Sequence, residues 1–140
     1  VQGAAGFLVL CLCAASGHVR RLGYQAVGSF LKALREGPTF AERPQVERAL
    51  CCLRDAVTEV DQRVPGITAC FLAQGLNILT RPASAQYRTV NQFLLSRPYL
   101  DLSELPLFFS HFHGGSGAGP REDRLWFLSM LNAGMHSDVD

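Results

Sequence analysis

The 140-residue chain lacks a surplus of charge of either sign. Its 13 basic and 12 acidic residues leave a net charge of +1, and Lys32 is its only lysine. The arginines are scattered, without the stripe or cluster that binds successive phosphates. The composition therefore argues against dominant, direct nucleic-acid binding by this chain and leaves only single arginine contacts open.

A disulfide framework is also lacking. The five cysteines are odd in number, lie in apolar helical patterns and include two neighbours; they are Cys11, Cys13, Cys51, Cys52 and Cys70. Disulfide-rich domains show even counts at regular spacings, so we predict buried free thiols in a reducing compartment. Cys11 and Cys13 have no matching downstream pair, so no zinc site is predicted.

Signatures of catalysis are missing as well. The glycine-rich tract 114–119 lacks the Lys and Ser/Thr that end a phosphate-binding loop, so we predict a surface loop. His111 and His113 are two residues apart and would point in different directions on a helix. No Gly-x-Ser-x-Gly elbow occurs. Cys51 and Cys52 lie near Arg48 and Arg54, which can activate a thiol, but small buried residues are the favoured interpretation.

The sequence therefore predicts a protein that is not an enzyme, with no catalytic, cofactor-binding or metal-binding residues and no small-molecule substrate. Its clustered aromatics are assigned to the core rather than to a base-stacking platform, because basic residues are not interleaved with them. These aromatics are Phe108, Phe109, Phe112, Trp126 and Phe127.

The apolar stretch over residues 3–17 has two interpretations. It resembles the apolar region and cleavage site of a secretory signal, but it lacks an initiator Met and a basic flank. It is too short to span a bilayer. A buried core helix is favoured, and a secreted protein stays open as the alternative. Both chain ends look like cuts, so we expect residues 1–140 to form a single helical-repeat segment of a larger protein with no membrane partner.

Helical periodicity dominates the rest of the chain. We predict seven helices, over about residues 3–15, 18–35, 44–61, 67–80, 84–95, 104–112 and 120–132. The second should bury a stripe from Val19 and Leu22 to Phe30 and Leu34. The fourth is apolar nearly all round and should be central, with Ile67, Phe71, Leu76 and Leu79 buried. Short breaks between helices predict an all-α fold of stacked antiparallel helix pairs, a HEAT/armadillo-like α-solenoid fragment.

One part of the sequence resembles a known family. The run Phe93-Leu94-Leu95-Ser96-Arg97-Pro98-Tyr99-Leu100-Asp101-Leu102 continues through Leu105-Pro106-Leu107-Phe108. After a polar loop follow Arg121-Glu122-Asp123-Arg124-Leu125-Trp126-Phe127-Leu128 and Leu131-Asn132-Ala133-Gly134-Met135. This pattern resembles the C-terminal region of the nucleolar pre-ribosomal-associated proteins, the Urb/Npa type. Glycines 114–119 depart from that pattern, but within a loop.

The resemblance implies a large, helical, non-enzymatic scaffold of the nucleolus that acts in large ribosomal subunit assembly and pre-rRNA processing. It implies as partners other pre-ribosomal assembly factors, including a DEAD-box RNA helicase, and pre-ribosomal RNA through the full-length protein. A generic HEAT-like adaptor in transport or trafficking is the alternative.

Within the matching run, Asp101 carries a structural hypothesis. Pro98 stops the fifth helix, and Leu100 and Leu102 should point inward while Asp101 points outward. Asp101 would then cap the sixth helix or pair with Arg97 or Arg124, fixing the angle between helices.

Overall fold

The computed structural model describes residues 2–107 and 121–135, and within these ranges the fold is all-α without strands. The elements are α1 (Gln2–Leu10), the 3-10 turn η1 (Cys11–Cys13), α2 (Gly17–Glu36), α3 (Arg43–Ala56), α4 (Gly66–Leu79), α5 (Tyr87–Leu95) and α7 (Arg121–Gly134). The all-α prediction is confirmed. The stacking of these helices into a solenoid stays a prediction.

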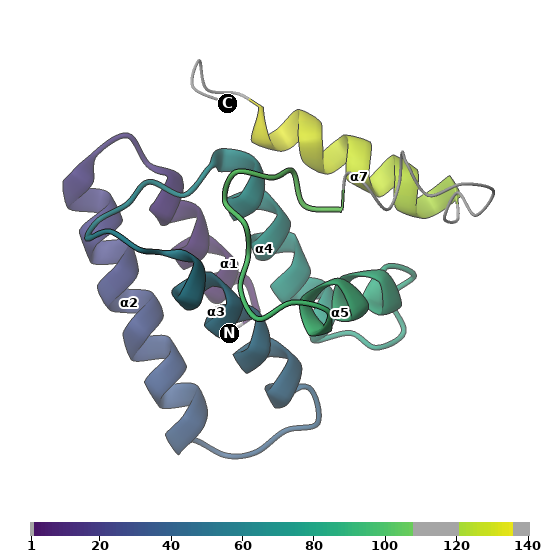
Figure 1. Cartoon of the computed structure of the whole chain (residues 1–140). Helices are drawn as coiled ribbons and strands as arrows, with labels where there is room; N and C mark the ends of the chain where they lie inside the picture. The colour runs from purple at the N-terminus through teal and green to yellow at the C-terminus, as the bar shows by residue number, and fades with distance from the viewer. Residues whose placement is uncertain (1, 108–120, 136–140) are drawn as a thin grey trace.

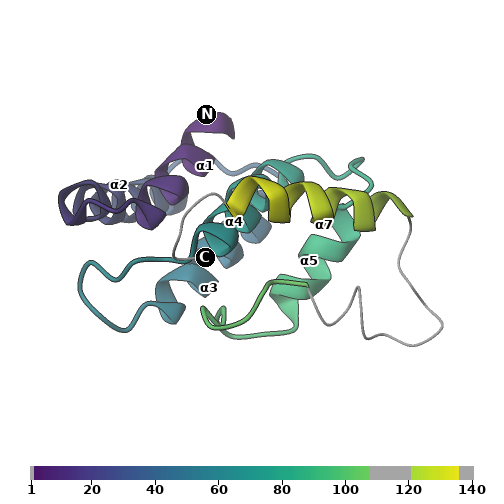
Figure 2. The same cartoon turned by 90° about the horizontal axis from the view of Figure 1, so that it is seen from above.

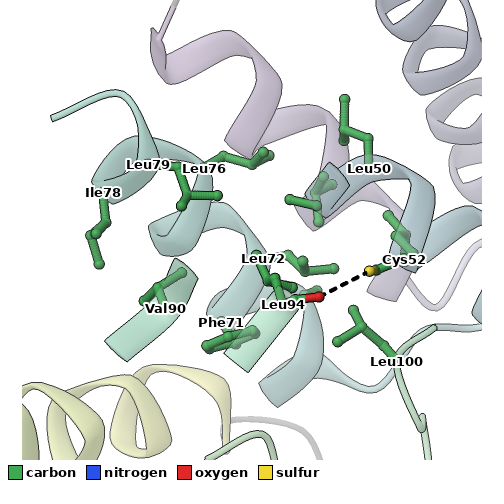
Figure 3. Packing of buried hydrophobic residues seen from close by; sticks show 14 of the residues in the cluster. Leu50, Cys52, Phe71, Leu72, Leu76, Ile78, Leu79, Val90, Leu94 and Leu100 are labelled. Carbon is green, nitrogen blue, oxygen red and sulfur yellow. Dashed lines mark hydrogen bonds between the residues drawn. The ribbon is translucent and has the colours of Figure 1, made fainter. Parts of the chain in front are cut away.

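Helix α4 forms the centre of the molecule. It contacts α1, α3, α5, α7 and η1 (Figures 1 and 2). The predicted burial of Ile67, Phe71, Leu76 and Leu79 is confirmed, since each is at most 5% exposed. Figure 3 shows leucines of α3, α4 and α5 in one cluster, in which Phe71 lies beside Leu72 and Leu94. A helix with almost no polar face is stable here because neighbours cover most of its circumference.

The apolar N-terminal stretch is a packed helix, as the favoured interpretation predicted. Ala5, Val9 and Leu12 are buried, and a Cβ on Gly6 would lie 3.2 Å from the carbonyl oxygen of Ala73, so α1 and α4 approach closely. The helix ends earlier than predicted, at Leu10, and the chain continues as η1. Among the described residues, no helix combines the length and apolarity needed to cross a bilayer.

Helix α2 buries only part of the predicted stripe, because Phe30 and Leu34 pack against the core and the residues nearer its start do not. Ser16 caps its start by accepting a hydrogen bond from the Val19 backbone N–H. Its buried residues are Gly23 and Leu31, whereas Val19 and Leu22 of the predicted stripe are exposed. Gly23 faces η1, where an added Cβ would come within 3.0 Å of Cys11 and Leu12 side-chain atoms. The absence of a side chain at Gly23 lets η1 pack closely against this face of α2.

Polar side chains attach α2 to the connection between α3 and α4. Arg20 Nε donates to the Asp61 carbonyl at 2.9 Å, and the Tyr24 hydroxyl donates to the Gln62 carbonyl at 2.6 Å. From the same connection, Arg63 Nε donates to the carbonyl of Cys13 in η1, just before α2, at 2.9 Å. Burial raises the pKa of the Tyr24 phenol. We call these four residues, Arg20, Tyr24, Asp61 and Arg63, the polar latch.

The same connection explains why α3 ends at Ala56 and not at Asp61. Gln62 Oε1 accepts hydrogen bonds from the backbone N–H groups of Thr58 and Glu59, which offers these groups an alternative to the helix. Asp61 then adopts a positive φ of 57°. Val60, which the longer predicted helix would have contained, is 94% exposed. The prediction for residues 57–61 was therefore wrong.

The C-terminal third agrees in part with the prediction. α5 begins at Tyr87 and α7 begins at Arg121, close to the expected starts. Residues 101–107 form turns where a sixth helix was expected to begin. The rest of that expected helix, the loop 114–119, His111, His113 and the aromatics Phe108, Phe109 and Phe112 lie outside the described residues.

Candidate functional site

The run Phe93–Leu102, which carries the family resemblance, lies against α3. Arg48 donates from Nε to the Leu94 carbonyl at 3.4 Å and from a terminal nitrogen to the Arg97 carbonyl at 2.6 Å. Cys52, one turn further along α3, places its Sγ 3.8 Å from the Leu94 carbonyl oxygen (Figure 3) and 3.8 Å from the Arg97 carbonyl oxygen. A cation at the C-terminal end of a helix satisfies free carbonyls and complements the helix dipole. Arg48 thus caps α5 from a neighbouring helix.

Sequence reasoning noted Arg48 only as a neighbour of two cysteines and missed this role. A signal exists, because Arg48 and Cys52 are four residues apart and so share one face of α3. That face also carries the buried residues Ala49 and Leu53. An arginine beside a buried helical stripe needs acceptors nearby, and the carbonyls released where Pro98 stops α5 provide them.

Aromatic contacts extend the junction from α5 to α7. The Arg97 guanidinium lies 3.7 Å from the Phe93 ring centroid and donates to the Phe93 carbonyl at 3.1 Å. Phe93 meets Phe71 edge-on at 5.1 Å, and Phe71 lies 6.4 Å from Trp126. Phe127 is fully buried and Trp126 packs against the core, so the prediction that these two aromatics are core residues is confirmed.

Asp101 points outward, as predicted, but its hydrogen-bond partner is Ser103 and not one of the expected groups. Leu100 is buried and its N–H donates to the Cys52 carbonyl at 3.1 Å, Leu102 packs against the core, and Asp101 is exposed, as predicted. Asp101 Oδ1 accepts from the Ser103 backbone N–H at 2.9 Å and from the Ser103 hydroxyl, closing a local turn. These bonds lower the pKa of the Asp101 carboxyl. Within the described ranges it pairs with neither Arg97 nor Arg124.

A second polar link, also missed, joins α5 to α7. The Thr89 hydroxyl donates to Asp123 Oδ2 at 2.6 Å, and Asp123 is only 3% exposed. The sequence suggested only that an acidic residue suits the first turn of this helix. Burial of that carboxylate depends on where α5 lies, which periodicity does not reveal.

The cysteines are free thiols, but only Cys52 is buried, so the prediction of five buried thiols was too broad. Desolvation by burial raises the pKa of the Cys52 thiol, opposite to the lowered pKa of a reactive cysteine. Within residues 2–107 and 121–135 no three His, Cys, Asp or Glu residues gather as a metal site would require.

An apolar groove of about 530 Å³ lies beside the C-terminal end of α2. Its lining comes from α1 to α4 and from the connection after α2, and includes Phe30, Leu34, Phe40, Val46 and Leu76. Glu42 is the one charged residue of the lining. A single carboxyl among hydrocarbon side chains provides no acid–base or nucleophile–base pair.

The fold and these contacts define an all-α protein in which the distinctive residues join helices to one another. The sequence matches the family described as Nucleolar pre-ribosomal-associated protein 1 over residues 5–140, and the chain belongs to this family. It is 26% identical over 134 residues to Nucleolar pre-ribosomal-associated protein 1 of Homo sapiens and 27% identical to that of Mus musculus. These alignments cover 96% of this chain and 6% of each relative. No solved structure matches the chain.

Proposed function

We propose that this chain is a non-enzymatic helical scaffold segment of a nucleolar factor for large ribosomal subunit assembly and pre-rRNA processing. The observation that carries the proposal is the family match over residues 5–140. Because the chain spans 6% of the length of its curated relatives, we propose that residues 1–140 form one segment of a much longer protein.

The geometry supports a scaffold. The residues that carry the family resemblance, from Phe93 to Leu102, bond to α3 and contact the aromatic core. Their polar groups bind backbone carbonyls or adjacent side chains in the same protein. Helices that are held rigidly offer binding surfaces at fixed angles to one another. A scaffold contributes such surfaces to a large assembly.

The partners we propose are other pre-ribosomal assembly factors, including a DEAD-box RNA helicase, with pre-ribosomal RNA bound through the full-length protein. We propose no membrane partner and no small-molecule substrate. The nucleolus is the proposed location, in line with the name of the family.

The test is microscopy of the tagged full-length protein and its purification from whole-cell extract, with identification of the proteins and RNAs that accompany it. We expect large-subunit precursor RNA, assembly factors and the helicase. Phe71→Ala within the full-length protein should reduce this recovery because it disrupts the segment, whereas Leu22→Ala at an exposed position should not. Cytoplasmic location with recovery of transport factors would instead establish the adaptor alternative.

A further inference from the structure

A second hollow lies where the C-terminal half of α4 faces α7 and the turn that precedes α5. Its volume is about 360 Å³, within the range of roughly 300–1,000 Å³ that ligand pockets occupy. Unlike the apolar groove, it is lined mainly by polar side chains: Gln74, Asn77, Arg81, Ser84, Gln86 and Trp126. We call it the amide pocket.

The hydrogen bond between Trp126 and Gln74 determines which atom of the Gln74 amide is free to bind a ligand in the amide pocket. Trp126 Nε1 lies 2.7 Å from Gln74 Oε1. An indole N–H can only donate, so the atom facing it must be the amide oxygen. The Gln74 amide nitrogen therefore keeps both of its donors for a ligand. The Asn77 side chain, three residues further along the same face of α4, has no partner among the described residues and offers both a donor and an acceptor.

The spacing of these groups suits an extended chain. Gln74, Asn77 and Arg81 follow one another along the exposed side of α4 and its C-terminal end over on the order of 10 Å, at 1.5 Å of rise per residue. About three residues of extended peptide cover the same length, at roughly 3.3 Å each. Side-chain amides at the first two positions can therefore bond the N–H and C=O groups of a strand-like segment whose third residue reaches Arg81.

The charge of the amide pocket selects among such segments. Arg81 is exposed and forms no ion pair within the described ranges, and no acidic residue belongs to the lining. A guanidinium binds a carboxylate through two parallel hydrogen bonds. An RNA strand of the same length would bring a phosphate with every nucleotide, and a single cation matches that pattern poorly.

We propose that the amide pocket binds an extended acidic peptide segment of a partner protein, its backbone held by the Gln74 and Asn77 amides and a carboxylate held by Arg81. This inference rests on the proposed scaffold function and names the chemistry of one partner. The Trp126 ring forms the wall beside the bound segment.

Trp126 also reports on occupancy, because it is the only tryptophan of the chain. The probes are the hexapeptide acetyl-Ser-Val-Thr-Asp-Val-Ser-amide and two matched peptides with Asn or Lys in place of Asp, titrated while indole fluorescence is recorded. The Asp peptide should bind saturably and about tenfold more tightly than the Lys peptide, because only the Asp peptide brings a carboxylate to Arg81. A six-nucleotide oligouridylate forms the RNA arm.

Two variants separate the roles of the residues. Arg81→Gln should abolish the preference for the Asp peptide, and Lys32→Gln, the same charge change on α2, should leave the preference intact. Asn77→Ala should weaken all three peptides several-fold without changing their order. Circular dichroism of each variant verifies that the helices persist, as expected for substitutions at exposed or half-buried positions.

Equal binding of the Asp and Lys peptides, tighter binding of oligouridylate, or unchanged fluorescence with every peptide would overturn the proposal. So would an Asp preference that survives Arg81→Gln. If the peptides do not bind but the full-length protein still recovers pre-ribosomal particles, the amide pocket is refuted and the proposed function stands. Loss of particle recovery would refute the proposed function, whatever the peptides do.

Discussion

Helices α4 and α2 show two ways in which a helix is held in this structure. Ten of the fourteen residues of α4 are buried, but only Gly23 and Leu31 are buried among the twenty of α2. α4 lies between other helices and is held by apolar burial (Figure 1). α2 lies at the edge, where it packs against α1, η1 and α3 and hydrogen bonds of the polar latch join it to the connection after α3. An apolar stripe is therefore buried only where a neighbour covers it, and α2 leaves Val19 and Leu22 exposed.

The largest effect should come from Phe71→Ala in α4. Removal of a fully buried ring that contacts Phe93 and Trp126 should lower the free energy of unfolding by about 3–5 kcal/mol. Urea unfolding followed by circular dichroism measures this. The matched substitution in α2 is Leu22→Ala, at a position 51% exposed, which should stay within about 0.5 kcal/mol of the parent. Equal costs at the two positions would remove the distinction between these helices.

A smaller loss is expected from Gly134→Ala, where α7 meets α4. The added Cβ would lie 2.8 Å from the Ile67 Cα, and a backbone atom in the central helix cannot move aside cheaply. The variant should lose about 1–3 kcal/mol of stability through overpacking. Thermal unfolding checks this, and an unchanged midpoint would mean that α7 is held more loosely than α4's other neighbours.

Tyr24→Phe tests whether the polar latch holds α2. Loss of the hydrogen bond to the Gln62 carbonyl should cost about 0.5–1.5 kcal/mol at neutral pH. The pH dependence has a definite sign. Burial raises the folded-state pKa of this phenol, so its contribution is full below the ordinary tyrosine pKa and is lost as pH rises through the folded value.

The difference in stability between parent and Tyr24→Phe should therefore shrink in the alkaline range, when urea unfolding is repeated at a series of pH values. A difference that stays constant, or grows, as the phenol ionises would contradict the buried hydrogen bond.

The smallest effect should be a gain. Gly28 lies inside α2, and nothing stands within 4 Å of the Cβ that alanine would add. Gly28→Ala should raise the free energy of unfolding by about 0.5–1 kcal/mol, because alanine loses less backbone entropy in a helix. Gly28→Ala and Gly134→Ala together test how closely neighbours pack against the two helices. The same substitution should raise the free energy of unfolding in α2, at the edge, and lower it in α7, beside α4. A loss at Gly28 would place an unseen neighbour against α2.

Local sequence information determined the helices and most of their limits. Pro38 and Gly37 end α2, the break at Pro65 precedes α4, and Pro98 ends the helix that carries Leu94, because these residues act on their own backbone. The nearly all-apolar composition of α4 also revealed its central place, since only burial on several sides stabilises such a helix. The family resemblance rested on the same contiguous residues.

Tertiary structure alone decided which faces meet and which polar groups are shared between helices. Arg48 caps α5, Thr89 bonds Asp123, and Trp126 turns the Gln74 amide toward the amide pocket, across 34 to 52 positions of sequence. Periodicity cannot locate such partners, because a hydrogen bond depends on distance and direction in space. Gln62 likewise ended α3 by competing for its backbone N–H groups. The sequence by itself determined which apolar residues each helix carries, and the packing around α4 determined which of them are buried.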